Sequence, residues 1–279
     1  MADTAFKQMY RDEFIAAFEV RQSVLRKTVT TEAQINGQQA TFLVAGSGGA
    51  TAVTRGVNGL IPARAPDLNQ YTATLVEWHD LERRNRFNIY ASQGDGRRIM
   101  QMNTVGTINR KIDEDIVTEL NTATQNTGAA VTGSLQLVLK AKTILRNNKV
   151  RGRLTGLITP AMHAYLMQTS EFGSADYVAR KPFEMSPTDS DFEMFSWAEV
   201  DWIVHPELPG AGTNAEKCFM YHKSAIGHAC DLNSITTAVG YDEEQDYSFA
   251  RATTFMGSKL LQSSGVLVIN HDGSALVAA

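Results

Sequence analysis

The chain has 279 residues, 43% of them apolar, which is enough for one large core or two subdomains of ordinary globular composition. It contains no apolar run of about eighteen residues, and its N-terminus, MADTAFKQMYRDEF, lacks the apolar segment of a signal peptide. We therefore expect a protein that is cytosolic when made and has no membrane anchor. With only Cys218 and Cys230, the chain cannot form a disulfide framework.

The formal net charge of −4 hides an asymmetry between the two parts of the chain. Residues 1–111 hold 14 basic and 10 acidic side chains, a net +4, whereas residues 112–279 hold 12 and 20, a net −8. A nucleic-acid reader would instead concentrate basic residues on one face. The split favours a chain whose two ends meet different copies of itself, and it predicts no sequence-specific binding of DNA.

Residues 1–30 are predicted to form an amphipathic arm. Asp3 or Thr4 is suitable as the N-cap of a helix, and aromatic residues recur along one stripe of that helix. This stripe consists of Phe6, Tyr10, Phe14 and Phe18. Because an apolar stripe must be buried, we expect these four side chains to contact neighbouring subunits.

Residues 31–92 have a β-like pattern. The alternating segments QQATFLVAG, YTATLVEWHD and NIYA are separated by glycine-rich and proline-containing stretches such as GSGGA and PARAPD. The simplest interpretation is a long protruding β-hairpin. An exposed hairpin is only marginally stable alone, so we expect it to lie on a neighbouring surface.

Residues 93–129 are predicted to contain a helix of about 30 residues, well above the usual length. Ser92 and Asp95 resemble a capping box, apolar residues recur from Ile99 to Leu120, and Gly128 is a plausible stop. Within this helix the acidic run 113–115 points in different directions. A solvated face is therefore the simpler interpretation of that run.

The rest of the chain, residues 130–279, alternates helices and strands. Ser134 is expected to cap a helix that ends at Asn147, and Thr159 and Pro160 are expected to open a short one. The segments RLTGLI, WAEVDWIV and KCFMYHK are predicted strands, the last two flanking the loop HPELPGAGTNAE. Three more strands are predicted at Ile235–Tyr241, Tyr247–Leu261 and Val266–Asn270.

The stretch YHKSAIGHACD, with Cys218 just before it, raises the possibility of a metal or nucleophile site. A strand would place Cys218 and His222 roughly 13 Å apart, at about 3.3 Å per residue, which is too far to share a metal. A helix would place His228 and Cys230 about 200° apart. A structural role is favoured over a metal or Cys/His site, and we predict no catalytic, metal-binding or cofactor-binding residue.

A basic cluster lies near the end of the predicted hairpin region, and an acidic run, DEEQD, begins at Asp242. We hypothesise that the two pair between subunits and steer assembly, since such charges contribute more to specificity than to affinity. The alternative is a solvated rim. The residues concerned are Arg83, Arg84 and Arg86 on one side and Asp242, Glu243 and Glu244 on the other.

Three stretches carry a resemblance to a known family. FLVAGSGGATAVTRGVNGL resembles the start of the E-loop in major capsid proteins of tailed bacteriophages, in particular short-tailed ones. NIYASQGDGRRIMQMNTVGTINRKIDEDIV resembles the approach to the spine helix, and the helix itself, in the same proteins. The stretch that runs from YHKSAIGHACD to VLVINHDG is similar to the last segment of the same proteins. The order of elements resembles the Hong Kong 97-type capsid fold over nearly the whole chain.

This resemblance implies an α+β fold with five parts: an N-terminal arm (1–30), an E-loop (31–92), a spine helix in the P-domain (93–129), an A-domain with P-domain portions (130–236) and P-domain strands (237–279). It also implies that Tyr221 to Gly227 is a strand-to-helix junction capped by Ser224. The function implied is structural and not enzymatic. Copies would assemble into hexamers and pentamers of an icosahedral shell around double-stranded DNA, and the protein would reside in the virion.

The resemblance further implies a scaffolding protein and a portal as partners, with a decoration protein as an additional one. No lysine occurs between Lys27 and Lys111, so we expect no E-loop lysine for a covalent crosslink and a noncovalent shell. Three alternatives stay open at this point. They are an encapsulin-like compartment, a hydrolase that uses Cys218, His222 and His228, and a nucleic-acid-binding module.

Overall fold

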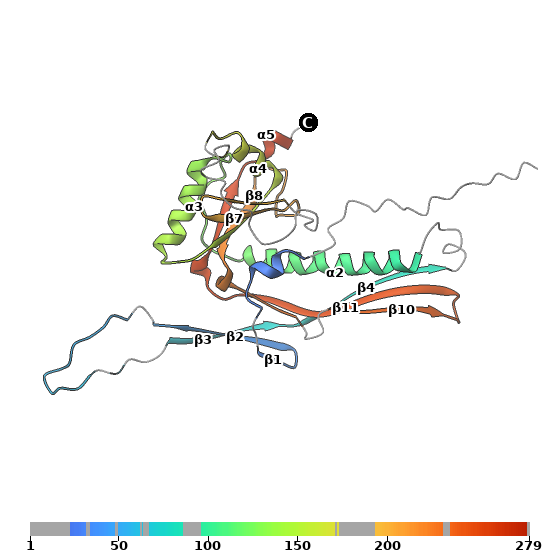
Figure 1. The fold of residues 1–279 in the computed structure, drawn as a ribbon, viewed down its shortest axis with the longest axis horizontal. Helices are drawn as coiled ribbons and strands as arrows, with labels where there is room; N and C mark the ends of the chain where they lie inside the picture. The colour runs from blue at the N-terminus through green and yellow to red at the C-terminus, as the bar shows by residue number, and fades with distance from the viewer. Residues whose placement is uncertain are drawn as a thin grey trace, which may run out of the picture.

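The computed structural model describes residues 23–31, 34–47, 50–61, 63, 67–85, 96–170, 172, 193–230 and 235–277. Three sheets and one long helix organise these residues. The long helix lies between a block of helices and strands on one side and an elongated sheet on the other, and a third sheet projects away from both (Figure 1). Four short helices complete the set: η1 (Leu25–Thr28), η2 (Lys223–Ala225), η3 (Ser263–Gly265) and α5 (Ser274–Val277).

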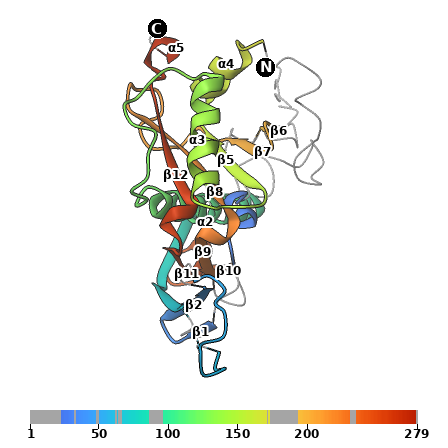
Figure 2. The same cartoon turned by 90° about the vertical axis from the view of Figure 1, so that its left-hand side faces the viewer.

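The first sheet has five strands in the order β12-β8-β5-β7-β6. Strands β5 and β7 pair in parallel, and every other pair is antiparallel. Two helices, α3 (Leu135–Asn147) and α4 (Pro160–Met167), pack on one face of it (Figure 2). The strands are β5 (Leu154–Ile158), β6 (Met194–Trp197), β7 (Val200–Val204), β8 (Glu216–His222) and β12 (Val266–His271).

Local capping chemistry fixes the starts of both helices, as the sequence predicted. The Ser134 hydroxyl accepts a hydrogen bond from the Leu137 amide, and the Thr159 hydroxyl accepts one from Met162. Pro160 occupies the first turn of α4, where the proline ring fits and no amide hydrogen is needed. The predicted starts of both helices, and the predicted end of α3 at Asn147, are therefore confirmed.

The long helix is α2 (Gly96–Leu120), and its apolar stripe packs on the other face of the five-stranded sheet. Ile108, Ile112, Ile116 and Leu120 lie at helical spacing and are almost completely buried. The helix ends at Leu120, well before Gly128, so the predicted stop was too late. Its proposed cap, Ser92 and Asp95, lies outside the described residues.

The second sheet, called the long sheet below, has the order β10-β11-β4, and β9 also pairs with β11. All of its pairings are antiparallel. One face of β11 packs against α2 through residues such as Ala252 and Met256. The strands are β4 (Val76–Asn85), β9 (Ile226–Cys230), β10 (Thr236–Asp242) and β11 (Tyr247–Leu260).

The third sheet, called the hairpin sheet, consists of β1 (Gln34–Asn36), β2 (Gln39–Gly46) and β3 (Asp67–Thr74). Its root has a small core of its own, in which Phe42 and Leu75 meet Ala229 and Leu261. Gly227 makes room for the Phe42 ring, because a Cβ there would lie 2.6 Å from a ring carbon. The predicted protruding hairpin is confirmed for the described residues.

Two predicted strands are interrupted in the structure. YTATLVEWHD is divided at Leu75 into β3 and β4, which belong to different sheets. WAEVDWIV is a hairpin whose turn residues, Ala198 and Glu199, both have positive φ. The three C-terminal strands are confirmed, but β12 pairs with β8 rather than with β10 and β11. Within the described part of the chain, no helix is both long and apolar enough to cross a membrane.

Candidate functional site

The stretch from Tyr221 to Gly227 does not form a strand-to-helix junction. It leaves β8, makes the single turn η2 and continues as β9, so the predicted helix is wrong. The cap of η2 is also different, because the His222 imidazole accepts from the Ser224 amide at 3.2 Å. His228 and Cys230 therefore point to the same face of a strand, and pairing of β9 with β11, which is distant in sequence, explains why.

His228 is completely buried and belongs to a hydrogen-bonded chain that links three elements. Its Nδ1 lies 3.0 Å from the Ser258 Oγ on β11, and that hydroxyl donates to the Asp115 Oδ2 on α2 at 2.5 Å. Burial lowers the pKa of His228 to about 4, so the imidazole is neutral. The serine lies between carboxylate and imidazole, which is not the order of a nucleophile, base and acid. These hydrogen bonds between Asp115, Ser258 and His228 hold α2 against the long sheet.

Cys218 offers no nucleophile. It is buried in the core between the five-stranded sheet and the helices α3 and α4, and burial raises the pKa of its thiol to about 12. Among the residues that the structure describes, no group of three acidic, histidine or cysteine side chains is placed to hold a metal ion. The arrangement of Cys218, His222 and His228 therefore gives no support to the hydrolase alternative.

The acidic run 113–115 is not the solvated face that was expected. Asp113 is 2% exposed and accepts hydrogen bonds from the Ser23 hydroxyl at 2.6 Å and from the amides of Val24 and Leu25. Burial raises its pKa to about 6, although the hydrogen bonds lower it. Of the three acids, only Glu114 is exposed. Asp113 directly follows the buried Ile112 on the helix, so the two side chains lie on neighbouring sides of it. This position could have indicated the burial of Asp113.

The segment that ends the N-terminal arm is anchored by further contacts. The Thr28 and Tyr221 hydroxyls share a hydrogen bond, and Thr30 bridges β9 through its amide to Ile226 and its carbonyl to His228. Together with Asp113, these bonds fix residues 23–31 to α2 and to the start of β9. Residues 23–31 therefore have a defined place beside the long helix.

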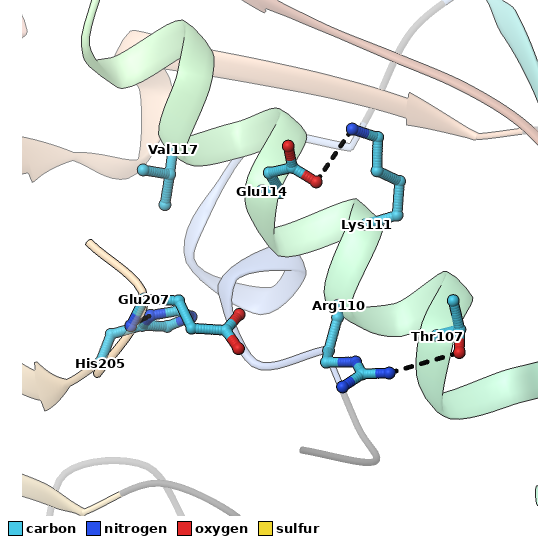
Figure 3. Close-up of a pocket in the computed structure, with 7 residues that line it drawn as sticks. All are labelled: Thr107, Arg110, Lys111, Glu114, Val117, His205 and Glu207. Carbon is cyan, nitrogen blue, oxygen red and sulfur yellow. Dashed lines mark hydrogen bonds and ion pairs between the residues drawn. The ribbon is translucent and has the colours of Figure 1, made fainter. Parts of the chain in front are cut away.

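An open cleft of about 460 Å³ lies between α2 and the loop that follows β7 (Figure 3). Its charged groups interact with groups of the same chain. Lys111 Nζ lies 2.9 Å from Glu114 and 4.3 Å from the centre of the Trp78 ring, and Arg110 donates to Thr107. The seven lining residues are Thr107, Arg110, Lys111, Glu114, Val117, His205 and Glu207.

His205 does not give this cleft a general base of ordinary strength. Its Nδ1 accepts the Glu207 amide hydrogen at 3.1 Å, and burial lowers the pKa of the imidazole to about 4. A general base works best when its pKa lies near the working pH. His205 is therefore poorly suited to act as a general base in this cleft.

A buried cluster fixes the loop Pro206–Glu216 to the five-stranded sheet. The Glu216 carboxylate is fully buried and accepts from the Thr159 hydroxyl at 2.5 Å and from the Gly212 amide at 2.7 Å. His271 Nδ1 lies 2.6 Å from the same carboxylate. Because a buried carboxylate needs such partners, the loop is held in one conformation at the end of β8 and β12.

The largest exposed apolar groups lie on the hairpin sheet and the loop that it carries. Leu60 is 73% exposed and Leu43 is 69% exposed. Large apolar side chains exposed on one projecting segment indicate an interaction surface. The set consists of Leu43, Val53, Val57, Leu60, Ile61 and Leu68.

A second surface is the face of the long sheet that points away from α2. Here the Arg83 guanidinium lies 4.9 Å from the centre of the Tyr247 ring, and Tyr247 packs edge-on against Phe249. Phe255 and Leu81 are on the same face and more than one third exposed. Aromatic and arginine side chains together are typical of residues that carry binding energy in interfaces.

The residues predicted to contact other subunits fall into two groups. Phe6, Tyr10, Phe14, Phe18 and Arg86 lie outside the described residues. Among the others, Arg84 forms an ion pair with Glu82 of the same chain at 2.7 Å, and Arg83 faces Asp242 within the long sheet. Glu243 and Glu244 are exposed in the turn between β10 and β11. Pairing between subunits therefore stays a prediction, and it would have to coexist with these contacts.

Comparison with known proteins places the chain among capsid components. A family model described as phage capsid protein matches residues 2–273. No curated protein matches the chain. Solved structures with a similar fold include one from Mycobacterium phage Che8, with a TM-score of 0.68 and 16% identity over 96% of this chain and 98% of the other.

Two further solved structures have similar values. The capsid structure of the cyanophage P-SCSP1u gives a TM-score of 0.70 and 11% identity, with 96% of this chain and 93% of the other covered. The capsid of Ralstonia phage GP4 gives 0.68 and 11%, with 97% and 96% covered. At such identities these structures establish a common fold.

Proposed function

Because the chain belongs to the phage capsid protein family, we propose that its exposed apolar surfaces bind other copies of the same chain and close an icosahedral shell around double-stranded DNA. Its role as a structural major capsid protein, and its place in the virion, follow from the family. The likeness to solved phage capsid chains confirms the mixed helix-and-sheet, Hong Kong 97-type fold predicted from the sequence.

We assign the hairpin sheet and its loop to the E-loop, α2 to the spine helix, the long sheet to the P-domain and the five-stranded sheet to the A-domain. In hexamers and pentamers, each E-loop would lie across the outer face of a neighbour's long sheet. The loops Pro206–Glu216 would meet around the capsomer axes. Such contacts join different surfaces on the two partners and close by rotation.

The observation that carries this proposal is the set of exposed apolar side chains on the E-loop, which lie outside the small core at its root. Burying a leucine or valine side chain contributes about 1.5–3 kcal/mol relative to leaving it in water. Leu43 and Leu60 alone expose about 70% of their surface in the single chain. A contact with a neighbour therefore stabilises the assembly by several kcal/mol before the cost of ordering the loop is subtracted.

The proposal extends to partners and to covalent chemistry. We infer a scaffolding protein, a portal and a decoration protein as additional partners, and host cytoplasm as the place of synthesis. The shell would be noncovalent, because the E-loop residues contain no lysine. Boiling purified particles in detergent should give monomers, and a ladder of multimers would refute this point.

The test compares the full chain with two variants by sedimentation velocity and negative-stain microscopy. We expect closed particles, or rings of five and six, for the wild type and a loss of particles for Leu60→Asp. Thr54→Asp is the matched control, because Thr54 is an exposed polar residue of the same loop and should tolerate the charge. Assembly of Leu60→Asp at the wild-type level would contradict the E-loop contact, and a monomeric wild type at every salt concentration would contradict assembly by this chain alone.

A further inference from the structure

The two outer edges of the long sheet differ in how they are protected against strand pairing. Across the described residues, no strand pairs with the outer side of β4 or of β10. Natural sheets protect such edges with charged residues, because an open edge is a template for another strand. β4 follows this rule with the titratable or charged side chains Glu77, His79, Asp80, Glu82, Arg83 and Arg84.

β10 does not follow it. Its sequence, TTAVGYD, has one charged residue, at its end, and no lysine or proline. Ala250 and Ser248 of β11 face α2 and are buried, but their partners on β10, Val239 and Tyr241, stay 42% and 38% exposed. Figure 1 shows why: α2 runs over β4 and β11, and β10 lies at the margin of the sheet.

We propose that β10 is an interaction edge that pairs antiparallel with β10 of a second copy of this chain, about a two-fold axis at Val239. The proposal rests on the proposed function, because it needs copies of the chain to meet. It adds a contact of a different kind, in which the same surface is used on both partners. The long sheets of two subunits would then continue into each other.

The sequence of β10 is complementary to itself in this register. Val239 lies opposite Val239 of the second copy, and Tyr241 lies opposite Thr237, so β-branched and aromatic side chains meet on the face that is now exposed. Asp242 lies opposite Thr236, so no like charges face each other. Cross-strand pairs of these types contribute about 0.2–1 kcal/mol each.

Because β10 is short, we expect the pairing only in assembled particles. Seven residues bury far less than the roughly 1,200 Å² of a stable interface, so β10 would not hold a dimer in dilute solution. In a shell, the E-loop contacts bring the edges together and the pairing is added to them. The contact is therefore to be sought in assembled particles of the full chain.

A cysteine at the two-fold position tests the register directly. In an antiparallel pair, opposite residues have Cα atoms about 4.5–5.5 Å apart, which is within the range of a disulfide. We expect Val239→Cys particles, treated with a mild oxidant, to run mainly as covalent dimers on a non-reducing denaturing gel. The wild type is the background control, because Cys218 is buried and Cys230 is half-buried.

Ala238→Cys is the matched control on the same strand. Residue 238 would lie opposite Gly240 of the second copy, so the two introduced cysteines would be diagonal neighbours, about 7–8 Å apart and out of disulfide range. The expected result is at least a tenfold larger dimer fraction for Val239→Cys than for Ala238→Cys. Equal fractions, or no dimer from Val239→Cys, would overturn the proposal, as would pairing of β10 with any other strand.

A second variant measures the contribution of the edge to assembly. Val239→Lys introduces the charge with which natural edges are protected, and at an exposed position it should leave the unfolding midpoint unchanged. We expect a several-fold lower particle yield, and a wild-type yield would count against the edge contact. If the wild-type chain forms no particles, the proposed assembly by this chain alone has failed. If it does and Val239→Cys stays monomeric, only the β10 pairing has failed.

Discussion

The five-stranded sheet and the hairpin sheet are both built from short alternating strands, yet they differ in what they pack against. Every residue of β5 and β7 is buried, by α3 and α4 on one face and by α2 on the other. In β3, Ala73 is the only buried residue. The first region thus carries its stability within the chain, and the second has apolar groups that the described residues leave exposed.

The largest expected effect is at the centre of the self-contained region. Trp202 is fully buried, its Nε1 donates to the Trp197 carbonyl at 3.0 Å, and its ring fills the space above Gly156. Trp202→Ala should lower the free energy of unfolding by about 3–5 kcal/mol in a denaturant titration, because a large cavity is left.

The matched change in the hairpin region is Leu60→Ala. Because Leu60 is exposed, this variant should change the free energy of unfolding of the single chain by less than about 0.5 kcal/mol. Equal losses in Leu60→Ala and Trp202→Ala would break the comparison between the two regions.

The root of the hairpin is the place where the two regions meet, and we expect an intermediate effect there. Phe42 is 3% exposed and lies against Gly227 of β9. Phe42→Ala should cost about 3 kcal/mol, felt mainly as faster hydrogen exchange of β2 and β3 amides rather than as global unfolding. Gly227→Ala should act in the same direction, since its Cβ would displace the ring. Unchanged exchange in both variants would mean that the root cluster does not hold the hairpin.

Asp113 makes the stability of the contact between α2 and residues 23–31 dependent on pH. Its pKa is raised from 3.8 to about 6, chiefly by burial, so the folded chain takes up a proton that the unfolded chain does not. Stability from this group therefore rises as the pH falls from about 6 towards 3.8, by up to about 3 kcal/mol. It is lost again as the pH rises through 6.

The measurement is the difference in free energy of unfolding between the wild type and Asp113→Asn across that pH range. His205 and His228, whose pKa values are lowered by burial, act in the opposite direction and cancel in this difference. The difference should increase towards acid pH. A difference that stays constant, or that decreases towards acid pH, would show that the pKa of Asp113 is not raised in the folded chain.

Local signals in the sequence predicted local features of the fold. Thr159 followed by Pro160, and Ser134 before an apolar run, placed two helix starts because a cap needs only its own neighbours. The long helix and the hairpin were equally visible as periodic patterns. Features that depend on distant residues were missed: β9 was assigned to a helix, although its pairing with β11 makes it a strand.

The candidate site was harder to predict for the same reason. Asp113 looked like one member of a solvated acidic run, and its burial depends on Ser23 and Leu25, which are far away in sequence. Arg84 was assigned to another subunit, yet Glu82 two residues earlier already pairs with it across the same face of β4. Contacts between copies depend on a second chain, so one sequence can suggest them only through exposed apolar groups.

A small effect is expected in the five-stranded sheet, at the turn between β6 and β7. Ala198 and Glu199 have φ values of 54° and 62°, the left-handed region that a two-residue hairpin turn of this type demands and that asparagine and glycine adopt more readily. No such residue stands there, which is why the sequence predicted one continuous strand. The double change Ala198→Asn and Glu199→Gly should raise the free energy of unfolding by about 0.5–1 kcal/mol.

Glu199→Gln is the control for the ion pair that the double variant loses. Lys142 Nζ lies 2.7 Å from Glu199, but this carboxylate is exposed, so the pair contributes little, and the bond from Lys142 to the Ala198 carbonyl is kept. The control should therefore unfold like the wild type. Because the turn belongs to the region that is stable within one chain, the double variant should raise the unfolding midpoint and leave the particle yield unchanged. A stabilised chain that no longer assembles would show that the two regions are coupled.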